Sequence, residues 1–447
     1  MIRAPMDAAP PATPPPIKTP DYSAAFRQRR VANWLVLGLT YATMYMGRYN
    51  FGIVNKSLSV HYGFDTKQIG TIISVASLIY GLSAIFNGPI ADRIGGRKAM
   101  LIGVFGGALF NVAFGLGAYI GALDSKSLLL GYFATMWALN NYFQSYSALA
   151  LIKVNASWFH ITERGRFSAI FGSMIQSGRF GILLLGGYLV ARHPWQWVFF
   201  IPAGMMVFMG VLTYLVVQDS PEKAAHPAFD TQDASSGYTG KVDFAYVAKQ
   251  VFTNPVTLTI AAAEFCTGVV RKGFEEWFPR YMQEHLHVAT DSGVFVKGTF
   301  SVVLAGIAGA FVAGYASDLL FNARRPPVAL IGYVLQALAL ITISLAPSTT
   351  FIILAVVVNS FAVSMVHSML SGTASMDFGG KKAAATAAGM FDGMQYVGGA
   401  LAGWPLGWVI GKYGWAGWGP SLAVFSIIGL ILMATLWNAR PSSRGGH

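Results

Sequence analysis

The stretch that decides the fold is a turn at residues 88–98, which reads GPIADRIGGRK. It joins an apolar run at about 68–91 to another at about 98–121. A shorter echo lies in the second half of the chain, where GYASD at 314–318 is followed by Arg324 and Arg325. In both turns a glycine stands four residues before an aspartate, and basic residues follow. The repeat predicts two related halves, the organisation of transporters whose halves rock about a central site. The simpler alternative is a basic loop that stays at the membrane surface.

The composition favours a membrane protein built from helices. Of the 447 residues, 54% are hydrophobic and only 11% are charged, whereas soluble domains carry about 25% charged residues. One membrane-spanning helix needs about 20 apolar residues, and the apolar runs are too continuous for a β-barrel. We predict twelve spans, at about 31–58, 68–91, 98–121, 127–155, 164–191, 196–217, 253–282, 293–320, 327–346, 349–376, 382–412 and 417–438.

These spans predict an all-α membrane protein of twelve transmembrane helices in two pseudo-symmetric six-helix bundles. Basic residues gather on one side of the predicted spans, which indicates the cytoplasmic side and accounts for the net charge of +12 without nucleic acid. Both termini and the central linker are therefore predicted to be cytoplasmic. The expected domains are a disordered tail at 1–30, bundles at 31–217 and 253–438, a linker at 218–252 and a tail at 439–447.

Two arginines are predicted to lie well inside the membrane. Arg48 falls in the first span and Arg271 in the seventh, which are equivalent helices of the two halves. A charge at mid-bilayer costs at least about 2.5–3.5 kcal/mol, so it normally faces a cavity or a partner. A guanidinium matches a phosphate or carboxylate with two parallel hydrogen bonds. The pair predicts an anion site between the halves; the alternative is internal pairing with Glu264, Glu275, Glu276 or Asp392.

Several stretches resemble one known transporter family. The turn at 88–98 resembles the signature of the major facilitator superfamily. Within it, the chain resembles the organophosphate:phosphate antiporters, which include glycerol-3-phosphate, hexose-phosphate and sugar-phosphate exchangers. The stretches that carry this likeness are GRYNF at 47–51, NYFQS at 141–145 through ERG at 163–165, RKG at 271–273 with Trp277 and Pro279, and KKAAATAAG at 381–389.

The resemblance implies that Arg48 and Arg271 grip the substrate phosphate and that internal phosphate exchanges for an external phosphorylated compound. The chain departs from the family at three cationic positions. Ala84 stands where many members have lysine in the second span, and Tyr49 replaces a lysine that often follows the first arginine. The fifth span has Arg179 near the site in place of a histidine. We expect Arg179 either to replace the lost charge or to pair with an acid.

Further residues are candidates for the site, although packing is the more common role for most of them. The expected substrate-binding set is Arg48, Arg271, Arg179, Tyr45, Tyr49, Tyr80, Gln144, Trp277, His367 and Tyr396. The expected conformational and coupling set is Asp92, Arg93, Arg97, Asp318, Asp392 and Glu264. In the first set the cations would hold the anion. In the second set the acids would pair with arginines or carry a coupling proton.

The sequence therefore predicts a secondary active transporter of a small, anionic, phosphorylated metabolite. A first alternative is proton-coupled transport of another organic anion, such as a carboxylate or a siderophore-like compound. A second is a membrane sensor of a sugar phosphate. No enzymatic, nucleotide-binding or metal-binding motif is evident. We expect no cofactor, no nucleic-acid partner, a monomer in the inner (plasma) membrane in contact with lipid, and phosphate or a proton as the coupled species.

Overall fold

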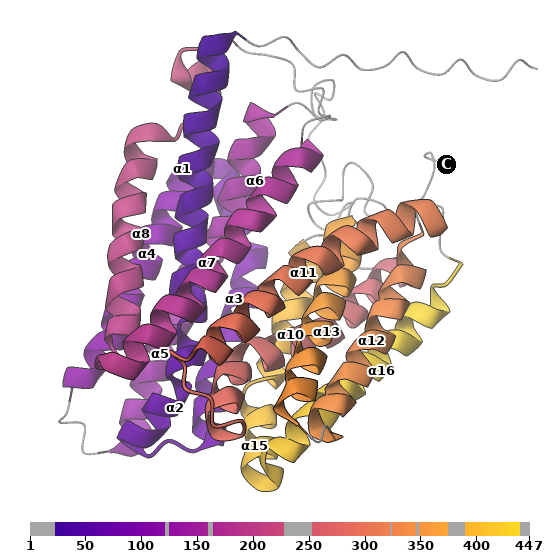
Figure 1. Ribbon diagram of the computed structural model, residues 1–447. Helices are drawn as coiled ribbons and strands as arrows, with labels where there is room; N and C mark the ends of the chain where they lie inside the picture. The colour runs from indigo at the N-terminus through magenta and orange to yellow at the C-terminus, as the bar shows by residue number, and fades with distance from the viewer. Residues whose placement is uncertain are drawn as a thin grey trace, which may run out of the picture.

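The computed structural model describes residues 23–120, 125–159, 164–227, 253–321, 324–345, 348–373 and 389–438. All regular secondary structure in these ranges is helical. The helices form two groups that lie side by side, one from each half of the sequence, and Figure 1 shows the groups meeting at one end and diverging at the other. This is the all-α, two-bundle architecture that the apolar runs predicted.

Helices occupy each of the first six predicted spans. Two of these spans are divided, the first at Asn50 and the fourth at Ser145. The elements are α1 (Ala24–Tyr49), α2 (Phe51–Tyr62), α3 (Thr66–Ile94), α4 (Gly96–Leu116), α5 (Lys126–Gln144), α6 (Tyr146–Trp158), α7 (Arg164–Arg192) and α8 (Trp197–Val216), with 3-10 turns at Gly117–Tyr119 and Glu222–Ala224.

Helices of the second half occupy the six remaining predicted spans. Its elements are α10 (Pro255–Glu284), α11 (Gly293–Leu320), α12 (Arg325–Leu345), α13 (Thr349–His367) with a π-helical end at Ser368–Thr373, a helical stretch at 389–401, α15 (Trp404–Tyr413) and α16 (Trp418–Thr435). A 3-10 turn at Gly414–Gly417 precedes α16. The predicted start of the eleventh span, at 382–388, lies outside the described residues.

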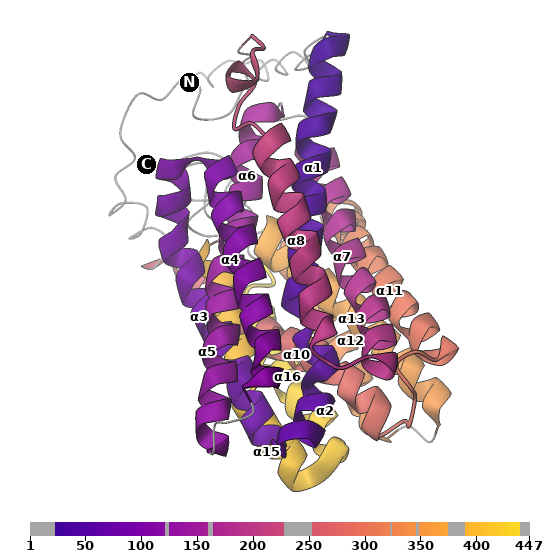
Figure 2. The same cartoon turned by 90° about the vertical axis from the view of Figure 1, so that its left-hand side faces the viewer.

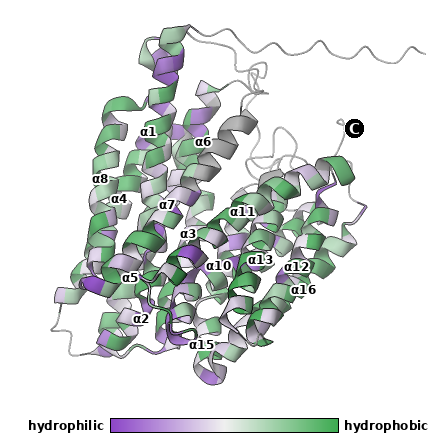
Figure 3. Cartoon of the chain, in the orientation of Figure 1, coloured by the Kyte–Doolittle hydropathy of each residue, from purple (hydrophilic) through white to green (hydrophobic). Residues whose placement is uncertain are grey.

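Seven helical segments in the described ranges are long and apolar enough to cross a membrane by length and composition alone. Figure 3 shows hydrophobic residues along the outer faces of both groups of helices. The other spans carry either a break or several charges. For example, α10 holds Glu264, Arg271, Lys272, Glu275 and Glu276 and is nevertheless largely buried. Charged residues of a spanning helix usually face the interior of the bundle.

Local sequence explains where several helices begin. The Ser23 side chain accepts a hydrogen bond from the Phe26 amide and caps α1, so residues 24–30, which we had expected in the disordered tail, are helical. Asp65 and Gln68 form a reciprocal capping box at the start of α3. Asn254 caps α10, and Pro255 stands at its first turn, where a missing N–H costs nothing.

Buried asparagines satisfy the backbone where the first span is divided. The Asn111 and Asn140 side chains both donate to the Gly47 carbonyl, at 3.0 and 3.1 Å. Asn50 donates to Asn111 Oδ1 at 2.8 Å and to the Val198 carbonyl at 3.2 Å. Side-chain amides from α4 and α5 thus replace helical hydrogen bonds, as irregular backbone inside a membrane requires.

The two halves contact each other toward the end of the molecule that holds α2, the start of α3 and α15. A Cβ added to Gly70 of α3 would lie 2.4 Å from the Gly403 carbonyl oxygen, so the two backbones touch. Nearby, Asn55 donates to the Glu276 carbonyl at 2.9 Å. At the other end, an added Cβ at Gly88 or Gly314 would meet no atom within 4 Å. Figure 2 shows that α1 begins at this second end.

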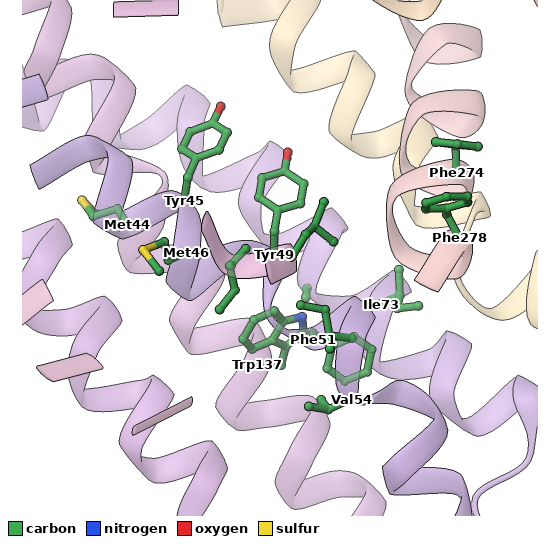
Figure 4. Packing of buried hydrophobic residues seen from close by; sticks show 14 of the residues in the cluster. Met44, Tyr45, Met46, Tyr49, Phe51, Val54, Ile73, Trp137, Phe274 and Phe278 are labelled. Carbon is green, nitrogen blue, oxygen red and sulfur yellow. The ribbon is translucent and has the colours of Figure 1, made fainter. Parts of the chain in front are cut away.

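A dense aromatic core packs against the first span where α1 ends and α2 begins. Phe51 stacks on Trp137 at 5.4 Å and meets Phe114 edge-on at 5.9 Å. Figure 4 shows Tyr45 and Tyr49 on the adjoining turns with their hydroxyl groups directed away from this core. The packing therefore fixes the helix on one side and leaves the two tyrosine hydroxyls on the side where the charged residues gather.

Candidate functional site

Arg48 is buried among neutral partners. Its side chain is 2% exposed, and its guanidinium donates to the Tyr80 hydroxyl at 3.3 Å, to the Gln144 carbonyl at 3.1 Å and side chain at 3.2 Å, and to Ser147 Oγ at 2.9 Å. The break between α5 and α6 leaves that Gln144 carbonyl free to accept. Among the described residues no acid lies within 4.0 Å of Arg48, and its Nε–H has no partner. Arg48 therefore forms no direct ion pair in the described part of the chain.

Arg271 occupies the equivalent helix of the second half in a different setting. Its Nε lies 3.0 Å from Glu275 Oε1, one turn along α10. Its Nη1 donates to Gln395 Oε1 at 2.8 Å and lies 3.4 Å from His367 Nε2, and its Nη2 donates to the Tyr49 hydroxyl at 3.5 Å. The bond to Tyr49 reaches across to the first half. Arg271 is thus both compensated by an acid and linked to the opposite bundle.

The Glu275 carboxylate forms ion pairs with three cations. Besides Arg271, its carboxylate lies 3.1 Å from Arg179 Nη1 of α7 and 3.8 Å from Lys272 Nζ. The Arg179–Glu275 pair joins the two halves. Lys272 also lies 3.5 Å from Glu276 Oε1. Of the two expectations for Arg179, the structure shows the pairing with an acid.

Tyrosine rings connect the two arginines through the middle of the molecule. Tyr45 stacks on Tyr49 at 5.3 Å, and Tyr80 of α3 stacks on Tyr396 of the second half at 3.8 Å. The Arg48 guanidinium lies 4.8 Å from the Tyr45 ring centre and 4.9 Å from that of Tyr80. Cations over aromatic faces are stabilised by the ring quadrupole.

Lys272 faces the same rings, at 4.7 Å from the Tyr49 centre and 5.2 Å from the Tyr396 centre. Cations from both halves therefore surround one tyrosine cluster, formed by Tyr45, Tyr49, Tyr80 and Tyr396.

Behind Arg271 lies a chain of buried polar groups. The Gln395 side-chain amide donates to Glu264 Oε2 at 2.7 Å and to His367 Nδ1 at 2.8 Å. Because the Gln395 oxygen faces Arg271 and its NH2 group faces Glu264 and His367, one amide connects a cation to a carboxylate. His367 and Glu264 thus lie beside Arg271, one step away from the tyrosine cluster.

The remaining predicted substrate and coupling residues are placed as follows. Trp277 is fully buried and donates its indole N–H to the Ala402 carbonyl at 2.8 Å, so it packs within α10 and its neighbours. Asp392 is half-buried, and no hydrogen bond or ion pair of its side chain is found in the described residues. Electrostatically it lies within reach of Arg48, Arg271 and Lys272.

The signature turn between α3 and α4 is held within the first half. Gly95 has φ +89° and lies against Asp219, which accepts from the Arg97 backbone N–H at 2.7 Å. The Arg97 guanidinium also donates to the Tyr214 carbonyl at the end of α8. Arg93 is exposed. The side chains of Asp92 and Asp318 lie outside the described set.

Sequence reasoning missed Lys272, Gln395 and Ser147 as members of the site and treated Glu275 only as a possible pairing partner. The signal for Lys272 was present, because it follows Arg271 directly. Glu275 stands four residues after Arg271, the spacing at which helical side chains meet. Gln395 carried no charge and therefore gave no signal in a membrane helix.

The arrangement can bind an anion and neutralise it from two sides. Guanidinium and ammonium groups from both halves converge on the tyrosine cluster, and three of the four cations, Arg179, Arg271 and Lys272, are paired with acids. In the described residues no group of three or more His, Cys, Asp or Glu side chains could hold a metal ion. The chemistry available here is reversible ion recognition by charge and hydrogen bonding.

Comparison with known proteins places this geometry in context. The family model described as Major Facilitator Superfamily matches residues 37–403. The membrane sensor protein UhpC of Escherichia coli is 26% identical over 98% of both chains. A glycerol-3-phosphate transporter of Bacillus subtilis is 27% identical over 93% of this chain and 94% of its own.

Among solved structures, a bacterial homologue of the human lysosomal transporter Spinster, in an inward-facing and unoccupied conformation, has a TM-score of 0.76. It is 14% identical in sequence, and the match covers 95% of this chain and 100% of that one. These findings confirm the family resemblance drawn from the sequence.

Proposed function

Because the chain belongs to the Major Facilitator Superfamily, we propose that it carries a small phosphate-bearing anion across the membrane by alternating access. The chain is a multi-pass membrane transporter and not an enzyme. The observation that carries the proposed substrate class is the pair Arg48 and Arg271, one from each half, both directed at one tyrosine cluster.

Phosphate fits this pair better than a monovalent anion. Each guanidinium can donate two parallel hydrogen bonds to a phosphate, and a dianion can neutralise both arginines together. The Arg48 Nε–H is buried and has no partner within the described ranges, so it is a donor available for such a ligand. The curated relatives include a glycerol-3-phosphate transporter, which agrees with this chemistry.

The conformation suggests how the anion enters. The halves touch at the end with Gly70 and Gly403 and diverge at the end where α1 begins. We assign the start of α1 to the cytoplasmic side from the distribution of basic residues, so this arrangement corresponds to an inward-open state. An anion from the cytoplasm would reach Arg48 and Arg271 and draw the two halves together around itself. Closure at this end would open the opposite end.

The test is exchange of radiolabelled inorganic phosphate in proteoliposomes loaded with phosphate. We expect exchange by the wild-type protein and its loss in Arg48→Lys and Arg271→Lys, because lysine cannot supply the two parallel donors. Arg192→Lys is the matched control, since Arg192 is an exposed residue that pairs with Asp291. Absence of exchange in the wild type would contradict transport of phosphate. Binding without exchange would instead match a sensor.

A further inference from the structure

Glu264 is a buried acid that the proposed anion site does not use. It lies in α10, two turns before Arg271, and is 0% exposed. Its Oε2 accepts one hydrogen bond, from Gln395 Nε2 at 2.7 Å. Its Oε1 is buried and has no hydrogen-bond partner among the residues that the structure describes. In the part of the chain that the structure describes, no cation lies within 4.0 Å of this carboxylate.

This setting does not suit a permanently ionised carboxylate. Burial of a charge is costly unless the charge is paired, and an acid inside a spanning helix normally has a cation or a function. Glu275 illustrates the contrast, because three cations surround it on the same helix. A protonated Glu264 would keep the Gln395 hydrogen bond at Oε2 and carry its proton on the unpartnered Oε1.

Among the described residues, no titratable group pairs directly with Glu264, and Arg271 acts on it only from a distance. On α12, the Tyr333 hydroxyl contacts the Ala263 carbonyl and the Thr267 hydroxyl, each at 2.7 Å. On the helical stretch 389–401, Asp392 is a second acid within electrostatic reach, and a negative charge on it would oppose the ionisation of Glu264. On α16, which also packs against α10, no titratable residue occurs.

His367 of α13 is the other candidate for a proton at this place. Both of its ring nitrogens face hydrogen-bond donors, because the Gln395 NH2 group lies 2.8 Å from Nδ1 and Arg271 Nη1 lies 3.4 Å from Nε2. A second proton on Nδ1 would face the Gln395 donor. Of the two groups that the Gln395 NH2 faces, the hydrogen-bond pattern therefore leaves the carboxylate of Glu264 as the one able to take up a proton.

We propose that Glu264 is a proton-binding site coupled to the anion site, and that its Oε1 takes up one proton when an anion binds at Arg271. The inference rests on the proposed function, because it assumes that Arg271 receives the transported anion. Gln395 provides the connection, since its oxygen accepts from Arg271 and its NH2 group donates to Glu264.

The coupling follows from charge. With no anion bound, the positive field of Arg271 favours ionised Glu264. A bound anion neutralises Arg271, removes that support and favours the protonated carboxyl. By linkage, a proton on Glu264 raises the affinity for the anion by the same factor. The carrier would then move the anion and a proton in the same direction, and the empty carrier would return after it releases the proton.

The experiment compares two transport modes in the same proteoliposomes. Exchange is measured with phosphate on both sides. Net uptake is measured into phosphate-free vesicles, with the external pH constant and the internal pH either equal to it or about one unit higher. For the wild type we expect net uptake to rise about tenfold with the gradient and to fall to the baseline with a protonophore.

Glu264→Gln should keep exchange, because glutamine mimics the protonated acid and exchange needs no release of the proton. It should lose the rise of net uptake with the gradient. Glu284→Gln is the matched control: Glu284 lies on the same helix, paired with Arg280 at 2.8 Å, and this variant should keep both modes.

The outcomes distinguish a failure of the proposed phosphate transport from a failure of the proposed proton site. No exchange by the wild type would contradict the proposed function itself. Exchange without any effect of the gradient would overturn only the proton site. If Glu264→Gln keeps the effect of the gradient, the proton travels on the phosphate and the proposed site on Glu264 is wrong. If Glu264→Gln loses exchange, the assumption that the carrier with uncharged Glu264 can exchange phosphate is wrong.

A second measurement needs no variant. Calorimetry of phosphate binding to the purified wild type in alkaline buffers of different ionisation enthalpy should show uptake of about one proton per phosphate. A value near zero would overturn the inference.

Discussion

Arg48 and Arg271 occupy equivalent helices, yet their surroundings differ in charge. Arg48 is held by neutral oxygens and tyrosine rings, whereas Arg271 is paired with Glu275 and linked through Gln395 to Glu264. The pseudo-symmetry of the fold therefore fixes the position of the two guanidinium groups and not their chemistry. The first half offers a constant positive charge, and the second half offers a positive charge that its own acids modulate.

The largest expected effect comes from Arg48, which forms no direct ion pair among the described residues. Arg48→Lys should reduce the rate of phosphate exchange at least about 100-fold, because one ammonium group cannot replace the forked donors that serve Tyr80, Gln144 and the anion together. Initial exchange rates, normalised to reconstituted protein, measure this. A loss smaller than that of Arg271→Lys would reverse the proposed ranking of the two arginines.

The next effect tests the packing that aligns Gln395 with Arg271. A Cβ added to Gly268 of α10 would lie 1.8 Å from the Gln395 carbonyl oxygen, so Gly268→Ala must push the helical stretch 389–401 away. We expect a loss of stability of about 1–3 kcal/mol, seen as a lower midpoint of thermal unfolding in detergent.

Gly298→Ala is the matched control for that substitution, because nothing lies within 4 Å of its added Cβ. Equal midpoints for the two alanine variants would show that α10 and the stretch 389–401 are not in close contact.

A smaller effect should follow when the acid beside Arg271 is neutralised. Glu275→Gln removes the negative charge that Arg179, Arg271 and Lys272 share, so phosphate binding should become tighter by about tenfold. Calorimetric titration with phosphate measures the affinity, with Glu284→Gln as control. Weaker binding would mean that Glu275 orients the cations for the anion instead of competing with it.

The smallest effect concerns a single hydrogen bond of the tyrosine cluster. Tyr80→Phe keeps the ring that stacks on Tyr396 and removes the hydroxyl that accepts from Arg48. Because one such bond contributes about 1 kcal/mol, phosphate affinity should change about fivefold. An effect as large as that of Arg48→Lys would indicate that the hydroxyl contacts the anion directly.

The fold could be predicted from the sequence because long apolar runs leave few alternatives to spanning helices. The divisions of the first span at Asn50 and of the fourth span at Ser145 could not be predicted in this way. Asn50 and Ser145 are not strong helix breakers, and the division of the first span depends on Asn111 and Asn140 from other helices. Contacts of this kind are non-local, so no pattern within the first span announces them.

The sequence predicted the cationic residues of the candidate site and not the hydrogen bonds that connect them. Arg48, Arg271 and Arg179 stood out because cations are rare inside spans. The role of Gln395 could not be predicted, because it depends on the hydrogen bonds that its neutral amide forms with Arg271 and Glu264 in the fold. Trp277 was a candidate because it belongs to the stretch of the seventh span that resembles the family. In the structure its indole N–H donates to the Ala402 carbonyl.

The most direct test of the central claim is phosphate affinity in Arg48→Lys, Arg271→Lys and the double variant, measured by calorimetry. If both arginines seat one anion, each single variant should bind at least about 30-fold more weakly, and the double variant should lose less than the product of the two single losses. Unchanged affinity in either single variant would show that the two halves do not share the anion.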